Sequence, residues 1–249
     1  MDKEDSERCK QRKGGYTGGI GNAVPEGPLG VREAVVGRRS VRRFLPTPVP
    51  SETVSAILAE AARAPSATNM QPWKVYVVTG TARDRLCRTV LDAANLGARS
   101  DEYAYMPSPL KEPYLSRRRR VGLDLYRLYQ VARDDMEGPK RVMLRNFEFF
   151  DAPVGLFFTM DRELLLGSWL DCGMFMQNVM ILARAYGLET CPQQAWCEYG
   201  AILHSELSIP DDEIILSGMA LGIADHYAPE NSLTTERQAP HEFTTFRGT

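Results

Sequence analysis

The segment from Leu164 to Tyr186 restricts the fold of this chain more than any other. Its periodicity predicts one long helix that ends before Gly187. The helix is apolar on nearly every face, through Trp169, Leu170, Met174, Phe175, Val179, Met180, Ile181 and Leu182. Such a helix needs protein all around it, and a single domain of 249 residues offers limited room for that. We therefore predict that the helix lies partly in a subunit interface.

Charge and cysteine usage exclude several classes of partner. The formal net charge is −2 and the pI is about 6.0, so we expect neither nucleic acid nor membrane as a partner, and anion binding must come from local arginine clusters. The five cysteines form no CxxC pair and the three histidines lie far apart, which argues against a disulfide scaffold and a metal site. The N-terminus lacks the apolar core of a signal peptide. We expect a cytoplasmic protein.

Two parts of the chain differ in composition. Residues 1–28 are charged and then glycine-rich, which predicts a flexible N-terminal arm, and no strand precedes their Gly-Gly-Ile-Gly run to make it a phosphate loop. No repeat or linker divides residues 29–249, so we predict one domain there. Its polar, tyrosine-bearing stretch 100–150 reads as a helical insertion.

The order of the predicted elements indicates an α+β fold. Helices are expected from Ser51 to before Pro65 and at 82–98, 113–133, 139–150, 164–186 and 198–207. Strands are expected at 75–78, 154–160, 188–191 and 214–221. No GxGxxG stands at a strand-to-helix turn, which argues against a Rossmann sheet. We predict a mixed β-sheet flanked by helices.

Residues 38–44, RRSVRRF, concentrate positive charge. The guanidiniums of Arg38, Arg39, Arg42 and Arg43 and the hydroxyl of Ser40 crowd into this segment. A phosphate group is their natural partner, because planar guanidiniums bind its oxygens two at a time. On its own, such a cluster is also compatible with a solvated basic surface.

About twenty residues later, residues 64–73 read APSATNMQPW and lead into a strand. Small residues and amides at a helix-to-strand turn provide hydrogen-bond donors with little bulk, as a flat ring with heteroatoms at its edge requires. The alternative is a simple turn with a buried Trp73.

Together these two segments resemble the N-terminal half of the FMN-dependent nitroreductase family. That family has an Arg-Arg-Ser-x-Arg segment, a helix, and then Ala-Pro-Ser-x-x-Asn-x-Gln-Pro-Trp. The resemblance covers roughly residues 30–247 and continues through 151–153, 187–192, 218–222 and Arg237. The insertion and the string GSWLD at 167–171 are most similar to the branch that reduces nitrobenzoates and other nitroarenes.

The resemblance implies a nitroreductase-like fold, an intertwined homodimer and FMN sites at the subunit interface. It assigns Arg38, Arg39 and Ser40 to the FMN phosphate, joined by Arg237, and Arg42 to the N1 and O2 edge of the ring. A cation there favours the reduced flavin, which can carry negative charge at N1.

The resemblance also assigns residues to the ribityl chain and the rest of the ring. Ser66, Asn69 and Gln71 would bind the ribityl chain or ring edge, from the same subunit or its partner. Residues 192–195 would lie along N5, where a backbone NH tunes hydride transfer. The positions implied are Pro192, Gln194 and Ala195. Many relatives have an acidic residue and glycine at the last two, so a backbone role is expected there.

The insertion carries aromatic and basic side chains. These are Tyr103, Tyr105, Tyr114, Tyr126, Tyr129 and the run Arg117 to Arg120. We hypothesise that the insertion caps the flavin, that its aromatics hold the acceptor ring, and that one arginine binds an acceptor carboxylate or nitro oxygen. Tyr114 and Arg118 are the residues we select. A solvated helix is the alternative.

The activity expected is reduction of a small aromatic acceptor by NADH or NADPH through FMN. Because no dinucleotide fingerprint exists, the donor and the acceptor would use the same space in turn, which predicts ping-pong kinetics without an obligatory catalytic side chain. Quinone or enone reduction, reductive dehalogenation, a non-catalytic flavin-binding protein and a nucleic-acid binder remain as alternatives. Neither the physiological acceptor nor the preferred donor follows from the sequence.

Overall fold

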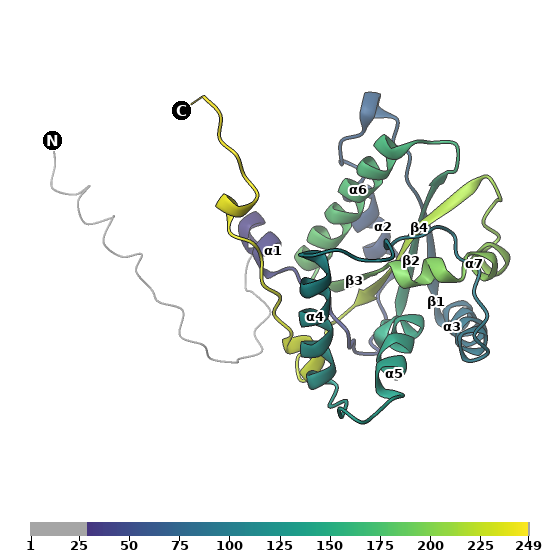
Figure 1. Ribbon diagram of the computed structural model, residues 1–249. Coiled ribbons are helices and arrows are strands. Elements are labelled where there is room, and N and C mark those ends of the chain that lie inside the picture. The colour runs from purple at the N-terminus through teal and green to yellow at the C-terminus, as the bar shows by residue number, and fades with distance from the viewer. Residues whose placement is uncertain (1–28, 249) are drawn as a thin grey trace, which may run out of the picture.

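The computed structural model describes residues 29–248, so the predicted arm at 1–28 lies outside the described residues (Figure 1). The helices are α1 Val31–Gly37, α2 Ser51–Ala61, α3 Gly80–Asn95, α4 Tyr114–Leu128, α5 Gly138–Leu144, α6 Leu166–Ala185 and α7 Gly200–Leu207. The strands are β1 Lys74–Thr79, β2 Val154–Asp161, β3 Glu189–Gln193 and β4 Glu213–Gly222. All four predicted strands are confirmed, each within one or two residues of its predicted bounds. The short α1 was not predicted.

The strands of the described region form one sheet in the order β1-β2-β4-β3. Every neighbouring pair is antiparallel. The α+β class is confirmed, but the mixed pairing expected within the sheet is wrong for these strands. Within residues 29–248, parallel pairing occurs only as the isolated bridges Ser40 to Thr190 and Ser100 to Tyr199.

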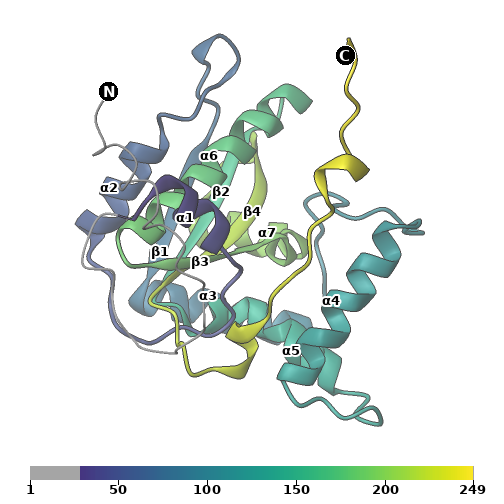
Figure 2. The same cartoon turned by 90° about the vertical axis from the view of Figure 1, so that its left-hand side faces the viewer.

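Helices cover both faces of the sheet (Figures 1 and 2). On one face, α2 and α6 pack through Ile57 and Phe175 against Leu156, Phe158 and other strand residues. A second cluster forms on α3, α7 and two 3-10 turns, Arg145–Asp151 and Gln194–Glu198. Its fully buried side chains include Leu86, Phe147, Phe157, Trp196 and Leu203. This double cover explains why β2 is buried over nearly its whole length.

Two strand glycines allow the aromatic layer to lie directly on the sheet. A Cβ at Gly155 would come within 2.3 Å of the Phe149 ring, and one at Gly218 within 2.4 Å of Trp196. Both aromatic side chains are completely buried. The close approach therefore requires glycine at these two positions.

Helix α6 is buried on one side and open on the other. Phe175 and Val179 are buried against the sheet, and Trp73 stacks on Phe175 with ring centroids 4.8 Å apart. Leu166, Leu170 and Met174, spaced four residues apart, form a stripe with exposed fractions of 80%, 71% and 39%. We call these three residues the α6 stripe. The described residues leave much of this stripe uncovered, so the predicted surrounding of α6 by protein is incomplete in the single chain.

The insertion does not follow its prediction throughout. Helix α4 stands at the periphery beside the C-terminal segment (Figure 2). The helix expected at 139–150 ends at Leu144 and continues as a kinked 3-10 turn, in which Phe149 and Phe150 have φ values of 51° and 53°. Burial of both rings stabilises this left-handed conformation, which local periodicity cannot indicate. Over residues 29–248, no helix combines the length and the apolar character that crossing a membrane requires.

Candidate functional site

We call residues 38–44 the arginine segment. This segment lies along β3. The Val41 amide donates to the Thr190 carbonyl at 3.1 Å, beside the parallel bridge from Ser40 to Thr190. Val41 and Phe44 are buried and anchor the segment. Arg38 and Arg42 are partly exposed and Arg39 is exposed. The backbone is thus held by the sheet while the guanidiniums stay near the surface.

The four arginines of this segment differ in their partners. Arg43 forms ion pairs with Asp151 at 2.7 Å and with the buried Glu230 at 3.1 Å. The Arg42 side chain donates only to the Ser40 carbonyl, at 3.2 Å. Arg38 and Arg39 make no hydrogen bond or ion pair with any of residues 29–248. Three cations are therefore available to an external anion, which fits a phosphate group.

We call residues 64–73 the amide turn. This turn lies at the start of α6. Its Ala67 amide donates to the buried Asp171 carboxylate at 3.2 Å, and the Gln71 amide donates to the Ser66 hydroxyl at 3.0 Å. Asn69 and Gln71 have φ values of 60° and 50° and are exposed. The turn therefore presents amide side chains on a backbone that α6 holds in place. No role for Asp171 was predicted from the sequence. An acidic residue inside so apolar a helix nevertheless indicates a buried polar contact such as this one.

Within one chain, the amide turn and the arginine segment lie far apart. Asp171 contacts the turn near the start of α6, whereas Arg184 near its end donates to the carbonyls of Glu33 and Ala34, just before Arg38. A rise of about 1.5 Å per residue separates these two contact points by about 20 Å along the helix. The two groups accordingly lie at opposite ends of α6 (Figure 1).

Residues 192–195 do lie near the arginine segment. Thr190, which pairs with that segment, and Gln194, just past the end of β3, are about 13 Å apart at the usual rise of a strand. The Gln194 amide donates to the Tyr103 hydroxyl at 3.4 Å, and Ala195 packs against the core. A single elongated ligand can therefore reach both the arginine segment and residues 192–195.

Arg237 lies in the exposed C-terminal segment. Its guanidinium donates to the Thr235 hydroxyl at 2.7 Å and to the Glu236 carbonyl at 2.9 Å. Glu236 pairs with Arg120, which ties the segment to α4. Among the described residues, Arg237 forms no hydrogen bond or ion pair with the arginine segment.

Three tyrosines of the insertion have partners inside the protein. Tyr103 donates to the Leu216 carbonyl at 2.5 Å, and Tyr129 donates to the Arg42 carbonyl at 3.3 Å. Tyr105 donates to Glu198 at 2.9 Å; burial and this bond raise the pKa of Tyr105 to about 12, against the opposing guanidiniums of Arg99 and Arg118. These three hydroxyls are used structurally.

Tyr114 and Arg118, in contrast, lie exposed at the start of α4. Tyr114 is 60% exposed, and the Arg117 guanidinium lies 6.0 Å from the centre of its ring. Arg118 is exposed and has no carboxylate partner among residues 29–248. Both side chains are accessible to a ligand.

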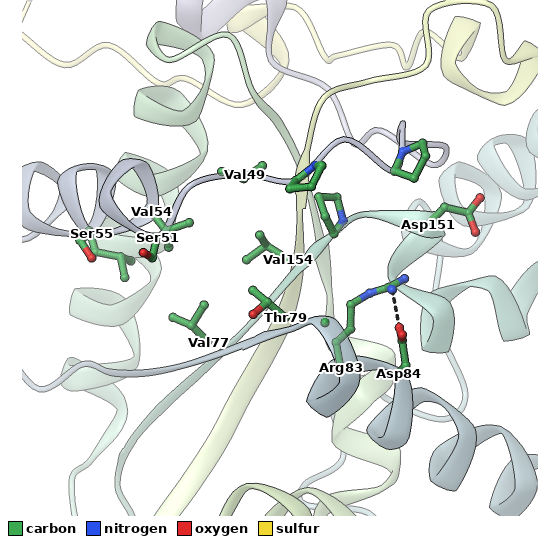
Figure 3. A pocket seen from close by; sticks show the side chains of 15 residues that line it. Val49, Ser51, Val54, Ser55, Val77, Thr79, Arg83, Asp84, Asp151 and Val154 are labelled. Atoms are coloured by element: carbon green, nitrogen blue, oxygen red, sulfur yellow. Dashed lines mark hydrogen bonds and ion pairs between the residues drawn. The ribbon is translucent and has the colours of Figure 1, made fainter.

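A cavity of about 630 Å³ lies elsewhere, between α2, the end of β1 and the start of α3 (Figure 3). Its walls include Val54, Val77 and Val154, and at one end Arg83 pairs with Asp84 at 2.8 Å. None of the residues assigned to the cofactor lines it. This cavity is therefore separate from the predicted cofactor site.

The fold and the site define a class: an α+β protein with an anion-binding segment at one end of an incompletely covered central helix and an amide turn at the other. The Nitroreductase family model matches residues 35–223. The chain belongs to this family.

Individual relatives match over nearly their whole length. A chloronitrobenzene nitroreductase of Comamonas testosteroni is 42% identical over 226 residues, 90% of this chain and 99% of the relative. A 4-nitrobenzoate reductase of Pseudomonas putida is 41% identical over 86% of this chain and 94% of the relative. Among solved structures, the FMN and NADPH-dependent nitroreductase NfnB from Sphigopyxis sp. strain HMH aligns with a TM-score of 0.86 at 38% identity, over 89% of this chain and all of that one.

Proposed function

We propose that this protein is an FMN-dependent oxidoreductase that reduces nitroaromatic compounds with NADH or NADPH. The relatives named above act on chloronitrobenzene and 4-nitrobenzoate, and the similar solved structure is FMN and NADPH-dependent. The observation that carries the proposal is the set of three unneutralised arginines beside β3, with residues 192–195 at the other end of the same strand. This arrangement suits a molecule with a phosphate at one end and a ring at the other.

The chain's own residues would hold and orient this cofactor. Arg38, Arg39 and Ser40 bind the phosphate, and Arg237 reaches the same group from the C-terminal segment. Arg42 would hold the N1 and O2 edge, where a cation about 4 Å from an anionic ring contributes about 4 kcal/mol at an effective dielectric constant of about 20. A bound FMN would supply hydride transfer at N5, and residues 192–195 would hold that side of the ring through a backbone NH.

A second copy of the chain would complete each site. The α6 stripe is a subunit interface, and Ser66, Asn69 and Gln71 of one subunit serve the cofactor held by the arginines of the other. The distance along α6 supports this, because both groups cannot serve the same end of one cofactor within a chain. The C-terminal segment runs away from the body with Phe243 and Phe246 exposed, and packing of these rings on the partner makes the dimer intertwined (Figure 1). Residues 29–249 form one FMN-binding domain, with the 100–150 insertion above the ring.

The visible spectrum of the purified protein tests this function. We expect a yellow protein with bound FMN that NADH or NADPH bleaches, and parallel double-reciprocal plots with 4-nitrobenzoate as acceptor. Bleaching without turnover of nitroarenes, quinones, enones or haloarenes would indicate a flavin-binding protein without this activity. A preparation that stays colourless and has no affinity for added FMN would refute the proposal.

Arg118 provides a test of how the acceptor is bound. If its free guanidinium meets the acceptor carboxylate, Arg118→Ala lowers kcat/KM for 4-nitrobenzoate about tenfold, the loss of one charge-assisted hydrogen bond, and leaves nitrobenzene unchanged. Steady-state kinetics on both compounds measure this preference, with Arg133→Ala, also an exposed arginine, as the control. An unchanged ratio in Arg118→Ala contradicts the assignment.

A further inference from the structure

The peptide group of Arg42 is clamped by a residue far away in the sequence. The Arg42 amide donates to the side-chain oxygen of Asn231 at 2.7 Å. The Asn231 amide nitrogen donates to the carbonyls of Arg43 and Asp225, both at 2.8 Å. Asn231 is 4% exposed, so both of its amide hydrogens and its oxygen are used inside the protein.

A second clamp comes from the insertion. The Tyr129 hydroxyl, at the C-terminal end of α4, donates to the Arg42 carbonyl at 3.3 Å. Burial raises the pKa of Tyr129 to about 12, so the hydroxyl remains a donor throughout the physiological range. The amide and the carbonyl of Arg42 are thus each held by a different segment.

The Arg42 side chain, unlike the Arg42 backbone, is not held by distant segments of the chain. Its guanidinium makes one hydrogen bond, to the Ser40 carbonyl, and has no carboxylate partner in the described part of the chain. The neighbouring Arg43, in contrast, is neutralised by Asp151 and Glu230. A fixed backbone that carries an unpaired cation is the arrangement expected where a charge must be held at a defined point for a ligand.

We infer that Asn231 is a positioning residue that holds the Arg42 cation at the edge of the flavin ring, with Tyr129 as a weaker second clamp. The inference rests on the proposed function. Neither residue touches the cofactor in this role; both act through the backbone of Arg42. Loss of the clamp lets the cation move away from the ring and removes its preference for the reduced, anionic flavin.

The test is a double-mutant cycle with Arg42, read as the midpoint potential of the bound flavin. Asn231→Ala is expected to lower the affinity ratio of reduced to oxidised FMN about tenfold, a shift of about −30 mV for a two-electron couple. In an Arg42→Ala background the same substitution is expected to cause little further shift, because the cation is already gone. Ser232→Ala is the control, since the side chain of that neighbour bonds only to the Pro229 carbonyl within the described residues.

If Asn231→Ala fails to fold, the same double-mutant cycle with Arg42→Ala is measured with Tyr129→Phe. This substitution removes one hydroxyl and leaves the ring unchanged. Its shift is expected to be smaller, about threefold in the same ratio, and to vanish with Arg42→Ala. Equal shifts in both backgrounds, or no shift in either variant while the wild-type protein binds FMN, overturn the inference. A wild-type protein that does not bind FMN refutes the proposed function instead.

Discussion

At the scale of single residues, identical side chains in one short segment have different tasks. Arg43 belongs to an ion-pair network with Asp151 and Glu230, and Arg145 joins it through Asp151 at 2.6 Å. Arg38 and Arg39 stand a few residues earlier without such partners. Since a buried carboxylate is costly without a cation, Arg43 serves folding, and the free arginines are left for binding.

This division predicts different consequences of substitution. Arg38→Ala should weaken FMN binding about tenfold or more, because a charge-assisted hydrogen bond contributes about 1.5–3 kcal/mol, with little change in the stability of the apoprotein. Arg43→Ala should instead lower the free energy of unfolding, because Glu230 loses its cation. Quenching of FMN fluorescence and urea unfolding measure the two effects.

Arg32→Ala, on the exposed side of α1, is the matched control and should change neither quantity. Equal losses of FMN affinity and stability in Arg38→Ala and Arg43→Ala would show that the segment acts as one structural unit.

At the scale of elements, one carboxylate connects three strands. Glu213, at the start of β4 and 3% exposed, accepts from Lys74 at 2.8 Å and Tyr76 at 3.1 Å on β1, and from Thr159 on β2. Burial by itself raises the pKa of Glu213, but the hydrogen bonds from Lys74, Thr159 and Tyr76 outweigh it and lower the pKa below the ordinary value of 4.5. The charged form is therefore the one that stabilises the sheet.

The lowered pKa predicts how stability depends on pH. The contribution of Glu213 is complete above the ordinary value of 4.5 and is lost as the pH falls through the lower pKa of the folded state. Glu213→Gln should cost about 2 kcal/mol at pH 7, and the difference from wild type should shrink as the pH falls below 4.5. Urea unfolding at a series of pH values measures it; a difference independent of pH would contradict the assignment.

At the scale of the whole molecule, one explanation accounts for both the exposed α6 stripe and the distance between the amide turn and the arginine segment. Exposed Leu166, Leu170 and Met174 form a continuous apolar row, which is unusual on the surface of a monomer. A second copy on this row would bring the amide turn of one subunit to the arginines of the other. Assembly and cofactor binding would then be coupled.

Leu170→Glu tests this coupling. A charge buried at the proposed interface should dissociate the proposed dimer, seen by light scattering, and should weaken FMN binding at least tenfold although the chain's own arginines are unchanged. Leu96→Glu, an equally apolar side chain that is 85% exposed after α3, is the control. A monomer that keeps full FMN affinity would show that Ser66, Asn69 and Gln71 do not serve the partner's site.

Local patterns predicted the elements well because burial repeats with the period of a strand or helix. Strands β1 to β4 and helix α6 lie within one or two residues of their predicted bounds. The helix expected to 150 was too long, since the left-handed turn at Phe149 and Phe150 depends on a pocket formed by distant strands. The mixed sheet was likewise wrong, because which strands pair and in which relative direction is a non-local property.

By itself, the sequence determined the α+β class, the family and the two segments that carry candidate cofactor residues, because these depend on residue type and short-range spacing. Only the tertiary structure decided which arginines are neutralised, that Asn231 holds the peptide of Arg42, and that the arginine segment and amide turn lie at opposite ends of α6. The partners in these contacts are separated by about a hundred residues or more along the chain. Their proximity follows from packing around the sheet, which no local pattern encodes.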